Sequence, residues 1–217
     1  LGVMNNDLNA QFRGSCVVID EYHILTAAHV VHNSITQHVI YKNEAYPCSI
    51  VAIHGDYKSG VMGKNDIAIA RLQRPIKLDF YPELYKDKDE VDKVCGLSGF
   101  GHHGDFNSGW IMSTFDNQRR AGSNIIDGVS KNVLQYSVHS GDKTELEFLI
   151  CPGDSGGGLF IDQKLAGIHS YVSATDGKGD SDYGDIGCST RVSDYVEWIE
   201  KVKEVLNEAI EEAKNNT

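Results

Sequence analysis

Three residue types that together can hydrolyse an acyl bond occur at separate points of the sequence: His29 in LTAAHV, Asp66 in NDIAIA and Ser155 in CPGDSGGG. A serine hydroxyl is a weak nucleophile at neutral pH and must lose its proton as it attacks. Histidine, with an ordinary pKa of about 6.5, can take that proton and return it to the leaving group. An ionised aspartate orients the imidazole and stabilises its charged form. We therefore expect His29, Asp66 and Ser155 to act as one catalytic triad.

The octet CPGDSGGG, residues 151–158, surrounds Ser155 with glycines. Glycine adopts left-handed and close-approach conformations that other residues resist, so this loop can aim main-chain N–H groups inward. We expect the N–H groups of Gly153 and Ser155 to form an oxyanion hole, in which one donor is worth about 3 to 4 kcal/mol. The octet alone is also compatible with a surface turn. His29 and Asp66 elsewhere in the chain favour catalysis, because they supply the base and the orienting acid that a serine nucleophile needs.

The segments that must hold these residues in place are mostly strands. Short runs rich in β-branched or apolar residues occur at 17–19, 50–53, 67–70 and 146–150, separated by Gly, Asn and Asp. This spacing indicates a barrel or sandwich and not alternating βαβ units. The charged stretch 79–93 is typical of a solvated linker between two halves.

Only the end of the chain has helical periodicity. Ser193 and Asp194 are candidate caps of this helix, with Glu197 as a capping-box acid. We expect the helix to pack on the body of the protein and not to bind a partner. Its apolar face is predicted to consist of Tyr195, Ile199, Val202, Leu206, Ile210 and Ala213.

Composition narrows the class of protein. The 217 residues carry 20 Lys and Arg against 31 Asp and Glu, a formal net charge of −11. A nucleic-acid binder needs clustered cations, and beyond the pair Arg119-Arg120 none appear, so we expect neither nucleic acid nor an anionic membrane as a partner. The apolar runs are also far shorter than the roughly 20 residues that span a bilayer.

Five segments in one order resemble the trypsin/chymotrypsin-like serine protease family: LTAAHV, NDIAIARL, GFG, GDSGGG and TRVSDYVEWI. The resemblance spans roughly residues 12–200. It implies an all-β fold of two antiparallel six-stranded β-barrels, with the triad in the cleft between them and a C-terminal α-helix. It also implies a serine endopeptidase, of bacterial type and with a non-tryptic pocket. The rival class is a catalytically silent binding module of the same fold.

The resemblance divides the chain into two barrels, a linker and a helix. The N-terminal barrel carries His29 and Asp66, and the C-terminal barrel carries Ser155 and the specificity pocket. The expected boundaries are 1–84 for the first barrel, 85–94 for the linker, 95–193 for the second barrel and 194–217 for the helix.

The cysteines depart from the family's pattern. Val30 follows the triad histidine, where the family commonly has Cys, and Ile161 occupies the usual partner position of Cys95. We therefore expect Cys95 to be a free thiol. A Cys151–Cys188 bridge is compatible with the sequence, although spacing alone cannot fix its geometry. We expect three or five free thiols and not the family's usual disulfide set.

By resemblance, the residue six before the nucleophile forms the floor of the specificity pocket. Leu149 stands there, followed by Ile150, and a cation buried against both would lose its hydration uncompensated. Cleavage after Lys or Arg is therefore disfavoured, and Val172 narrows the entry. We expect a preference for small or medium apolar residues before the cleaved bond. The pocket residues implied are Leu149, Ile150, Ser170, Tyr171, Val172 and Gly187.

One histidine supports a different preference. His169 matches a histidine that glutamate-specific relatives use to hold an acidic side chain, and Ser189 is a candidate hydroxyl beside it. This alternative predicts cleavage after Glu or Asp, increasingly at lower pH as the imidazole gains charge. One polar group rarely discriminates strongly, so we favour the apolar preference.

The loop TDGKGDSDYGD carries four aspartates between Asp176 and Asp185. Carboxylates at this density can hold Ca2+, but the spacing fits no defined calcium loop. We favour a solvated acidic insertion, with no metal or other cofactor.

The beginning of the chain and the location of the protein stay open at this level. Leu1 is either a mature end or a trimmed one, and in many family members a new N-terminal amine pairs with the residue matching Asp154. The resemblance implies a secreted or periplasmic protein, while unpaired cysteines are also compatible with the cytoplasm. We expect a monomer with a polypeptide substrate and a protein inhibitor as a further partner.

Overall fold

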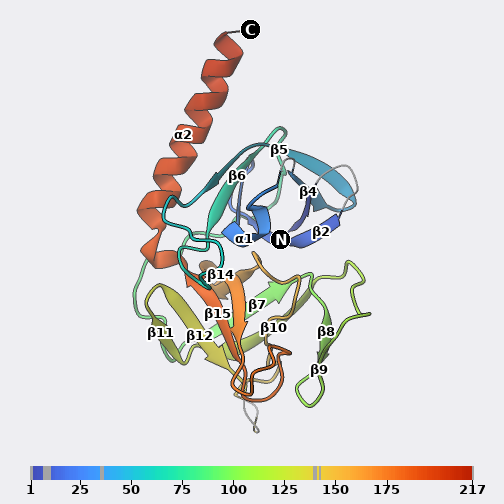
Figure 1. Ribbon diagram of the computed structural model, residues 1–217. Coiled ribbons are helices and arrows are strands. Elements are labelled where there is room, and N and C mark those ends of the chain that lie inside the picture. The colour runs from blue at the N-terminus through green and yellow to red at the C-terminus, as the bar shows by residue number, and fades with distance from the viewer. Residues whose placement is uncertain (1, 7–10, 35–36, 139–140, 142, 217) are drawn as a thin grey trace.

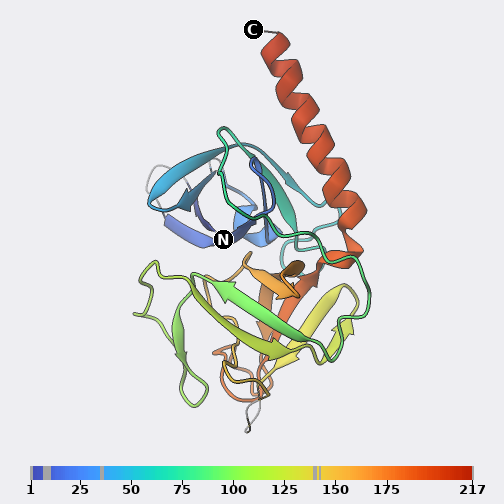
Figure 2. The same ribbon diagram turned by 180° about the vertical axis from the view of Figure 1, so that it is seen from behind.

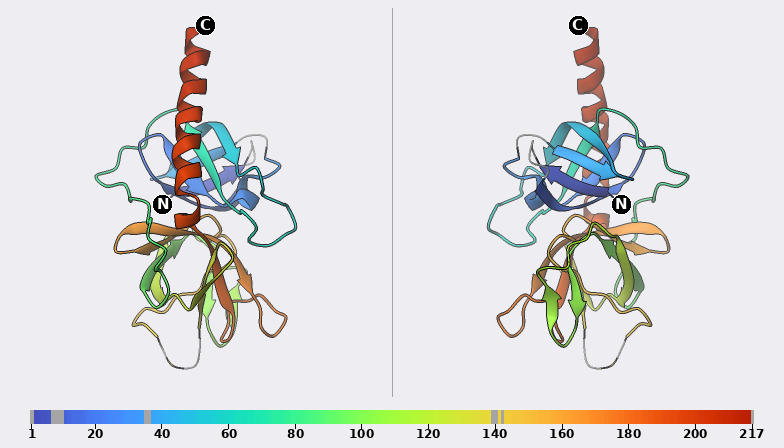
Figure 3. Two further views of the ribbon diagram at one scale, coloured as in Figure 1. Left: turned by 90° about the vertical axis from the view of Figure 1, so that its left-hand side faces the viewer. Right: turned by 90° about the vertical axis from the view of Figure 1, so that its right-hand side faces the viewer.

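The computed structural model describes residues 2–6, 11–34, 37–138, 141 and 143–216, and Leu1 lies outside these residues. Two β units are stacked on each other, and one long helix runs along the side of the first unit and beyond it (Figures 1 and 3). The predicted all-β architecture with a C-terminal helix is confirmed.

The N-terminal unit is a closed six-stranded barrel, as expected. Its interior is packed with aliphatic side chains. Strand β3 is buried along its whole length and pairs with β6, with Leu25 opposite Ile69. The strands in barrel order are β1 Gly2–Asn6, β2 Gln11–Val18, β3 His23–Thr26, β6 Ala68–Leu72, β5 Glu44–Ile53 and β4 Gln37–Tyr41.

The second unit differs in detail from the six-stranded barrel that we expected. Seven strands join in one antiparallel sheet, and a separate hairpin, β8 His103–Asp105 with β9 Gly109–Ile111, projects from it (Figure 1). The strands in sheet order are β10 Arg120–Ile125, β7 Val94–Gly99, β13 Gly158–Ile161, β14 Lys164–Ser173, β15 Ile186–Arg191, β12 Val133–Ser137 and β11 Gly128–Ser130.

The strand predicted at residues 146–150 is wrong. This segment makes one isolated bridge, Ser123 with Glu147, and then leaves the edge of β10. Leu149 and Ile150 are buried because they turn into the core of the second unit, not because they belong to a sheet. Apolar spacing alone could not separate these two reasons for burial.

Helix α2, Val196–Asn215, follows the 3-10 turn Val192–Asp194. The predicted capping by Ser193 and Asp194 is wrong, because the Ser193 hydroxyl bonds Glu90 and the Asp194 carboxylate accepts from Lys88. The predicted packing is confirmed: Ile199 and Leu206 are buried, and the helix lies on β6. Its last turns project beyond the barrel (Figure 3).

The connection between the two units is less solvated than its charged sequence predicts. Glu90 is fully buried and accepts two hydrogen bonds from Arg191, at 2.9 and 2.6 Å, and one from Ser193 at 2.8 Å. Tyr85 N–H also bonds the Leu165 carbonyl at the start of β14. The connection runs behind both units and ties the second one to the base of the helix (Figure 2).

Cys48, Cys95, Cys151 and Cys188 are free thiols, so the structure contains no Cys151–Cys188 bridge. Burial raises the pKa of Cys48, Cys95 and Cys151 to about 12. These thiols are therefore protonated and inert at neutral pH and pack as small apolar groups. No helix in the described part of the chain has the length and apolarity to cross a bilayer.

Candidate active site

His29 lies on the four-residue helix α1, Ala28–Val31, just after β3. Ala27 and Ala28 are fully buried where this helix meets the glycine loop. The approach is close, since a Cβ at Gly156 would lie 2.2 Å from Thr26 Oγ1 and that glycine has a φ of 84°. Small residues before His29 thus let the loop that carries Ser155 dock beside it. His29 itself has 40% of its side chain exposed and faces solvent.

Asp66, at the entrance to β6, contacts His29 twice. Its Oδ2 lies 2.7 Å from His29 Nδ1, and its Oδ1 accepts the His29 main-chain N–H at 2.9 Å. Burial raises the pKa of Asp66, but hydrogen bonds from His29 and Ser170 outweigh burial and hold it below its usual range. Asp66 is therefore ionised at neutral pH. A carboxylate that accepts Nδ1–H leaves the lone pair of the neutral imidazole on Nε2.

The second unit holds the same aspartate from the other side. Ser170 on β14 donates its hydroxyl to Asp66 Oδ2 at 2.5 Å, and Thr190 on β15 donates to the Asp66 carbonyl at 3.0 Å. Ser170 was expected to line the substrate pocket; its hydroxyl contacts Asp66, and the residue also borders a hollow next to His29. Thr190 was not singled out from the sequence, because its position beside Asp66 depends on the docking of the two units.

Ser155 lies at the junction of the two units. Its carbonyl accepts the Ser15 N–H at 2.7 Å, and a Cβ on Gly14 would meet both Ser155 O, at 2.6 Å, and Val30, at 2.9 Å. The nucleophile loop therefore lies against the residue that follows His29. Among the described residues, no hydrogen bond joins the Ser155 hydroxyl to His29, and such bonds often tighten only when substrate binds.

Two main-chain donors flank the nucleophile. Pro152 O accepts the His102 N–H at 3.0 Å and Asp154 O accepts the Gly157 N–H at 2.8 Å. Because a trans peptide points its N–H opposite to its C=O, the N–H groups of Gly153 and Ser155 turn away from these partners. Neither N–H donates a bond within the described residues. The oxyanion hole expected at these two N–H groups stays a prediction, with which their lack of a partner in the described residues is compatible.

Ser15 holds this loop in place and was missed by the sequence interpretation. Its hydroxyl donates to Gly153 O at 3.0 Å and accepts the Phe100 N–H at 3.1 Å, while its own N–H bonds Ser155. The side chain is fully buried. A lone serine in a strand carries no sequence signal for such a role, because its partners lie far along the chain.

Comparisons with known proteins agree with this geometry. A family model described as Trypsin matches residues 6–199. The chain belongs to the trypsin family. Chymotrypsin of Phaedon cochleariae is 30% identical over 204 residues, which cover 84% of this chain and 69% of that protein. Trypsin eta of Drosophila melanogaster is 26% identical over 213 residues, which cover 88% and 77%.

Two solved trypsin-family structures share the fold. Mouse neuropsin, a serine protease expressed in the limbic system of the brain, aligns with a TM-score of 0.73 at 20% identity, over 93% of each chain. Kallikrein-related peptidase 10, in complex with Zn2+, aligns with a TM-score of 0.70 at 20% identity, over 94% of this chain and 95% of the other. The protein is a chymotrypsin-like serine endopeptidase, and polypeptides are its substrates.

The residues expected to line the specificity pocket are mostly covered. Tyr171 and Val172 are half-buried, and Val172 packs against the core of the second unit. Gly187 is buried between other side chains and does not border open space. Those with at most 5% exposure are Leu149, Ile150, His169, Ser170 and Ser189.

His169 is the residue that the alternative assigns to an acidic substrate side chain. It is fully buried, its Nδ1 lies 3.0 Å from Ser189 Oγ, and burial lowers its pKa to about 3. Burial therefore favours the neutral imidazole at neutral pH. The Glu or Asp alternative, which depends on a charged imidazole at this position, stays a prediction.

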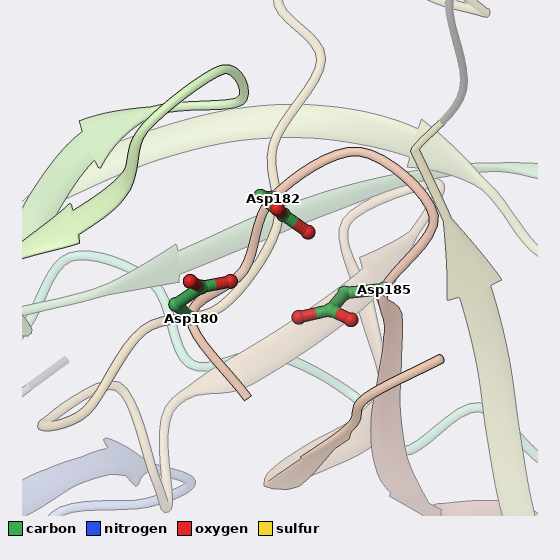
Figure 4. A group of neighbouring side chains, drawn as sticks. All are labelled: Asp180, Asp182 and Asp185. Atoms are coloured by element: carbon green, nitrogen blue, oxygen red, sulfur yellow. The ribbon is translucent and has the colours of Figure 1, made fainter. Parts of the chain in front are cut away.

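The acidic loop brings three carboxylates together. Asp180, Asp182 and Asp185 place one oxygen each within 4.8 Å of one another, and their carboxylates converge (Figure 4). Asp176 is not in this group. Asp185 is buried and accepts hydrogen bonds from the N–H groups of Thr175 and Ser181. Its carboxylate therefore stabilises the loop without a metal. The favoured interpretation, a solvated acidic insertion without a metal, stays a prediction, as does its calcium-binding alternative.

Asp154, the residue before the nucleophile, is buried under the loop. Its two oxygens accept the N–H groups of Gly101 and Cys151, each at 2.8 Å. A Cβ at Gly99 would lie 2.1 Å from Asp154 Oδ1, so GFG needs its first glycine to admit this carboxylate. Burial raises the pKa of Asp154 to about 6, despite the opposing effect of the two hydrogen bonds.

This shift predicts a pH dependence of stability. An unfolded aspartate has a pKa of about 3.9, so the folded chain binds more protons between about pH 4 and 6, and Asp154 contributes less stability as pH rises through this range. The free energy of unfolding can be measured with urea at pH 4, 5, 6 and 7. From pH 4 to pH 7 that of the wild type should fall by up to about 3 kcal/mol relative to that of Asp154→Asn. Asp162→Asn, at an exposed turn, is the control. Parallel profiles for wild type and Asp154→Asn would contradict the shift.

Proposed function

We propose that Ser155 attacks the substrate carbonyl, with His29 as general base and then general acid and Asp66 as the group that orients it. The N–H groups of Gly153 and Ser155 stabilise the oxyanion of the tetrahedral intermediate. The acyl-enzyme on Ser155 is then hydrolysed by water that His29 activates. These steps follow the established template for Ser-His-Asp enzymes, and they use only side chains and main-chain N–H groups of this chain.

One observation carries the proposal. Asp66 is buried and ionised, and it bonds both nitrogen donors of His29 while Ser170 and Thr190 hold it from the second unit. Burying a charge is costly unless it is fully hydrogen-bonded. A carboxylate satisfied in this way, next to a solvent-facing histidine, is suited to stabilise an imidazolium.

A hollow of about 250 Å3 beside the triad supports a polypeptide substrate with apolar side chains. It extends from His29 to Tyr171 and is bordered by Tyr57, Val61 and Met62. Val61 and Met62 are exposed, with 48% and 65% of their surface accessible. We propose that substrate side chains cover this apolar surface, and that the residue before the cleaved bond is small or medium and apolar, next to Leu149, Ile150 and Val172.

A fluorophosphonate probe tests the activity, because it reacts only with a serine that the site has made nucleophilic. Intact protein should label, and a peptide library read by mass spectrometry should show cleavage after Ala, Val or Leu and not after Lys or Arg. Intact protein that stays unlabelled, while a known relative labels and no activation step is found, would favour the silent binding module. We further propose a secreted monomer that protein inhibitors can block.

A further inference from the structure

Tyr136 lies in one row with two of the expected pocket residues. In the β12–β15 pairing it stands opposite Gly187, and in the β14–β15 pairing Gly187 stands opposite Val172. Directly paired residues of neighbouring antiparallel strands project to the same face of a sheet. Tyr136, Gly187 and Val172 therefore face the same side, where Leu149 belongs to the same packed cluster.

The Tyr136 ring fills the space in front of Gly187. A Cβ at Gly187 would lie 2.2 Å from Tyr136 Cε2 and 2.9 Å from Leu149 Cδ1, whereas a Cβ at the loop residue Gly177 would meet nothing within 4 Å. The missing side chain of Gly187 thus makes room for the tyrosine and not for a substrate. Gly187, expected among the pocket residues, therefore borders Tyr136 and Leu149.

Hydrogen bonds fix the far end of the ring. The Tyr136 hydroxyl lies 3.0 Å from Ser189 Oγ, which lies 3.0 Å from His169 Nδ1, and all three residues are fully buried. A buried polar group that loses its partner costs about 1 to 3 kcal/mol. Swinging the ring aside would break this chain of bonds, so the tyrosine is a fixed obstacle.

We propose that Tyr136 sets the upper size of the side chain accepted before the cleaved bond, and this inference rests on the proposed function. The ring packs in front of Gly187 and against Leu149, so a long substrate side chain directed past Val172 into this core would meet it. A small or medium side chain would stop short of the ring, whereas Phe or Tyr would need the volume that Tyr136 takes. His169, which the alternative assigns to acidic side chains, is joined to the Tyr136 hydroxyl through Ser189.

Tyr136→Ala tests the proposal against a matched control. The readout is the ratio of kcat/KM for two peptides that differ only in Phe or Ala before the cleaved bond. Tyr136→Ala should raise this ratio at least about tenfold, the scale of a change in pocket size. Leu134→Ala removes a fully buried side chain two residues earlier on the same strand, within the same core, and should leave the ratio unchanged. Tyr136→Phe keeps the ring but loses its bond to Ser189, so it should raise the ratio less than Tyr136→Ala does.

Active-site titration with the fluorophosphonate probe distinguishes a failure of the proposed function from a failure of the role of Tyr136 alone. A wild type that never labels overturns the proposed function. A wild type and Tyr136→Ala that both label, with the same Phe to Ala ratio, overturn the role of Tyr136 alone. If Tyr136→Ala does not fold, Tyr136→Leu retains more apolar volume, and its ratio should rise in the same direction. An unchanged ratio in Tyr136→Leu also overturns the role.

Discussion

Ser155→Ala is expected to lower kcat for peptide hydrolysis by about 10^6, the loss seen when a triad nucleophile is removed. The hydroxyl is the only part of the side chain that the proposed chemistry uses, and alanine keeps the backbone of the loop. The carbonyl of residue 155 still accepts from Ser15, and the φ values of Gly153 and Gly156 are unaffected. The thermal midpoint should therefore stay close to that of the wild type, while labelling by the probe disappears.

Ser49→Ala is the matched control for this loss. Ser49 is half-buried on β5, and its hydroxyl donates one hydrogen bond, to the Arg71 carbonyl at 2.9 Å. Its removal deletes a serine hydroxyl of similar burial, and the rate should stay at the wild-type level. Purified Ser155→Ala protein that retains more than about a thousandth of the wild-type rate would contradict Ser155 as the nucleophile.

Asp66→Asn is expected to lower kcat by about 10^4, the loss that the same change causes in the template triad. Asp66 accepts three hydrogen bonds through its two oxygens, from the His29 N–H, His29 Nδ1 and the Ser170 hydroxyl. Asparagine can offer one oxygen only, so its amide N–H2 must face one of these groups. If it faces Nδ1, the imidazole must place its proton on Nε2, where it cannot accept one from Ser155.

Glu90→Gln separates this effect from a general loss of stability. Glu90 is also fully buried, and its carboxylate accepts from Arg191 and Ser193. The variant should melt at a lower temperature and, below that temperature, hydrolyse peptides at the wild-type rate per titrated site. Equal losses of kcat in Asp66→Asn and Glu90→Gln would mean that the charge of Asp66 acts through folding and not through His29.

The fold class and the pairing of His29 with Asp66 could be predicted because each has a strong local signal in the sequence. Small residues precede His29, glycines surround Ser155, and alternating runs build strands. The positive φ of Gly153 and Gly156, and the close approach at Gly156, show why the glycine loop has its composition. The residues that make up each of these signals lie close together in the sequence, so the signals can be recognised without knowledge of the fold.

Features that depend on distant partners were missed or wrong. Ser15 and Thr190 bond the active-site loop and Asp66 across more than 120 positions of sequence. Glu90 was taken as solvated because its neighbours are charged, and its partner Arg191 lies at the end of β15. Gly187 was expected to line the substrate pocket, because no signal in the neighbouring sequence indicates that Tyr136 fills the space beside it.

Asp66 accepts hydrogen bonds from residues of both units, and this has a consequence for inhibition. Ser170 and Thr190 can hold the aspartate only while the second unit stays docked on the barrel. The rate of hydrolysis therefore depends on the docking of the two units, and not only on the folding of each. A compound that wedges into their junction, away from the triad, would lower kcat without competing with substrate. Such a non-competitive inhibitor would not need to resemble a peptide.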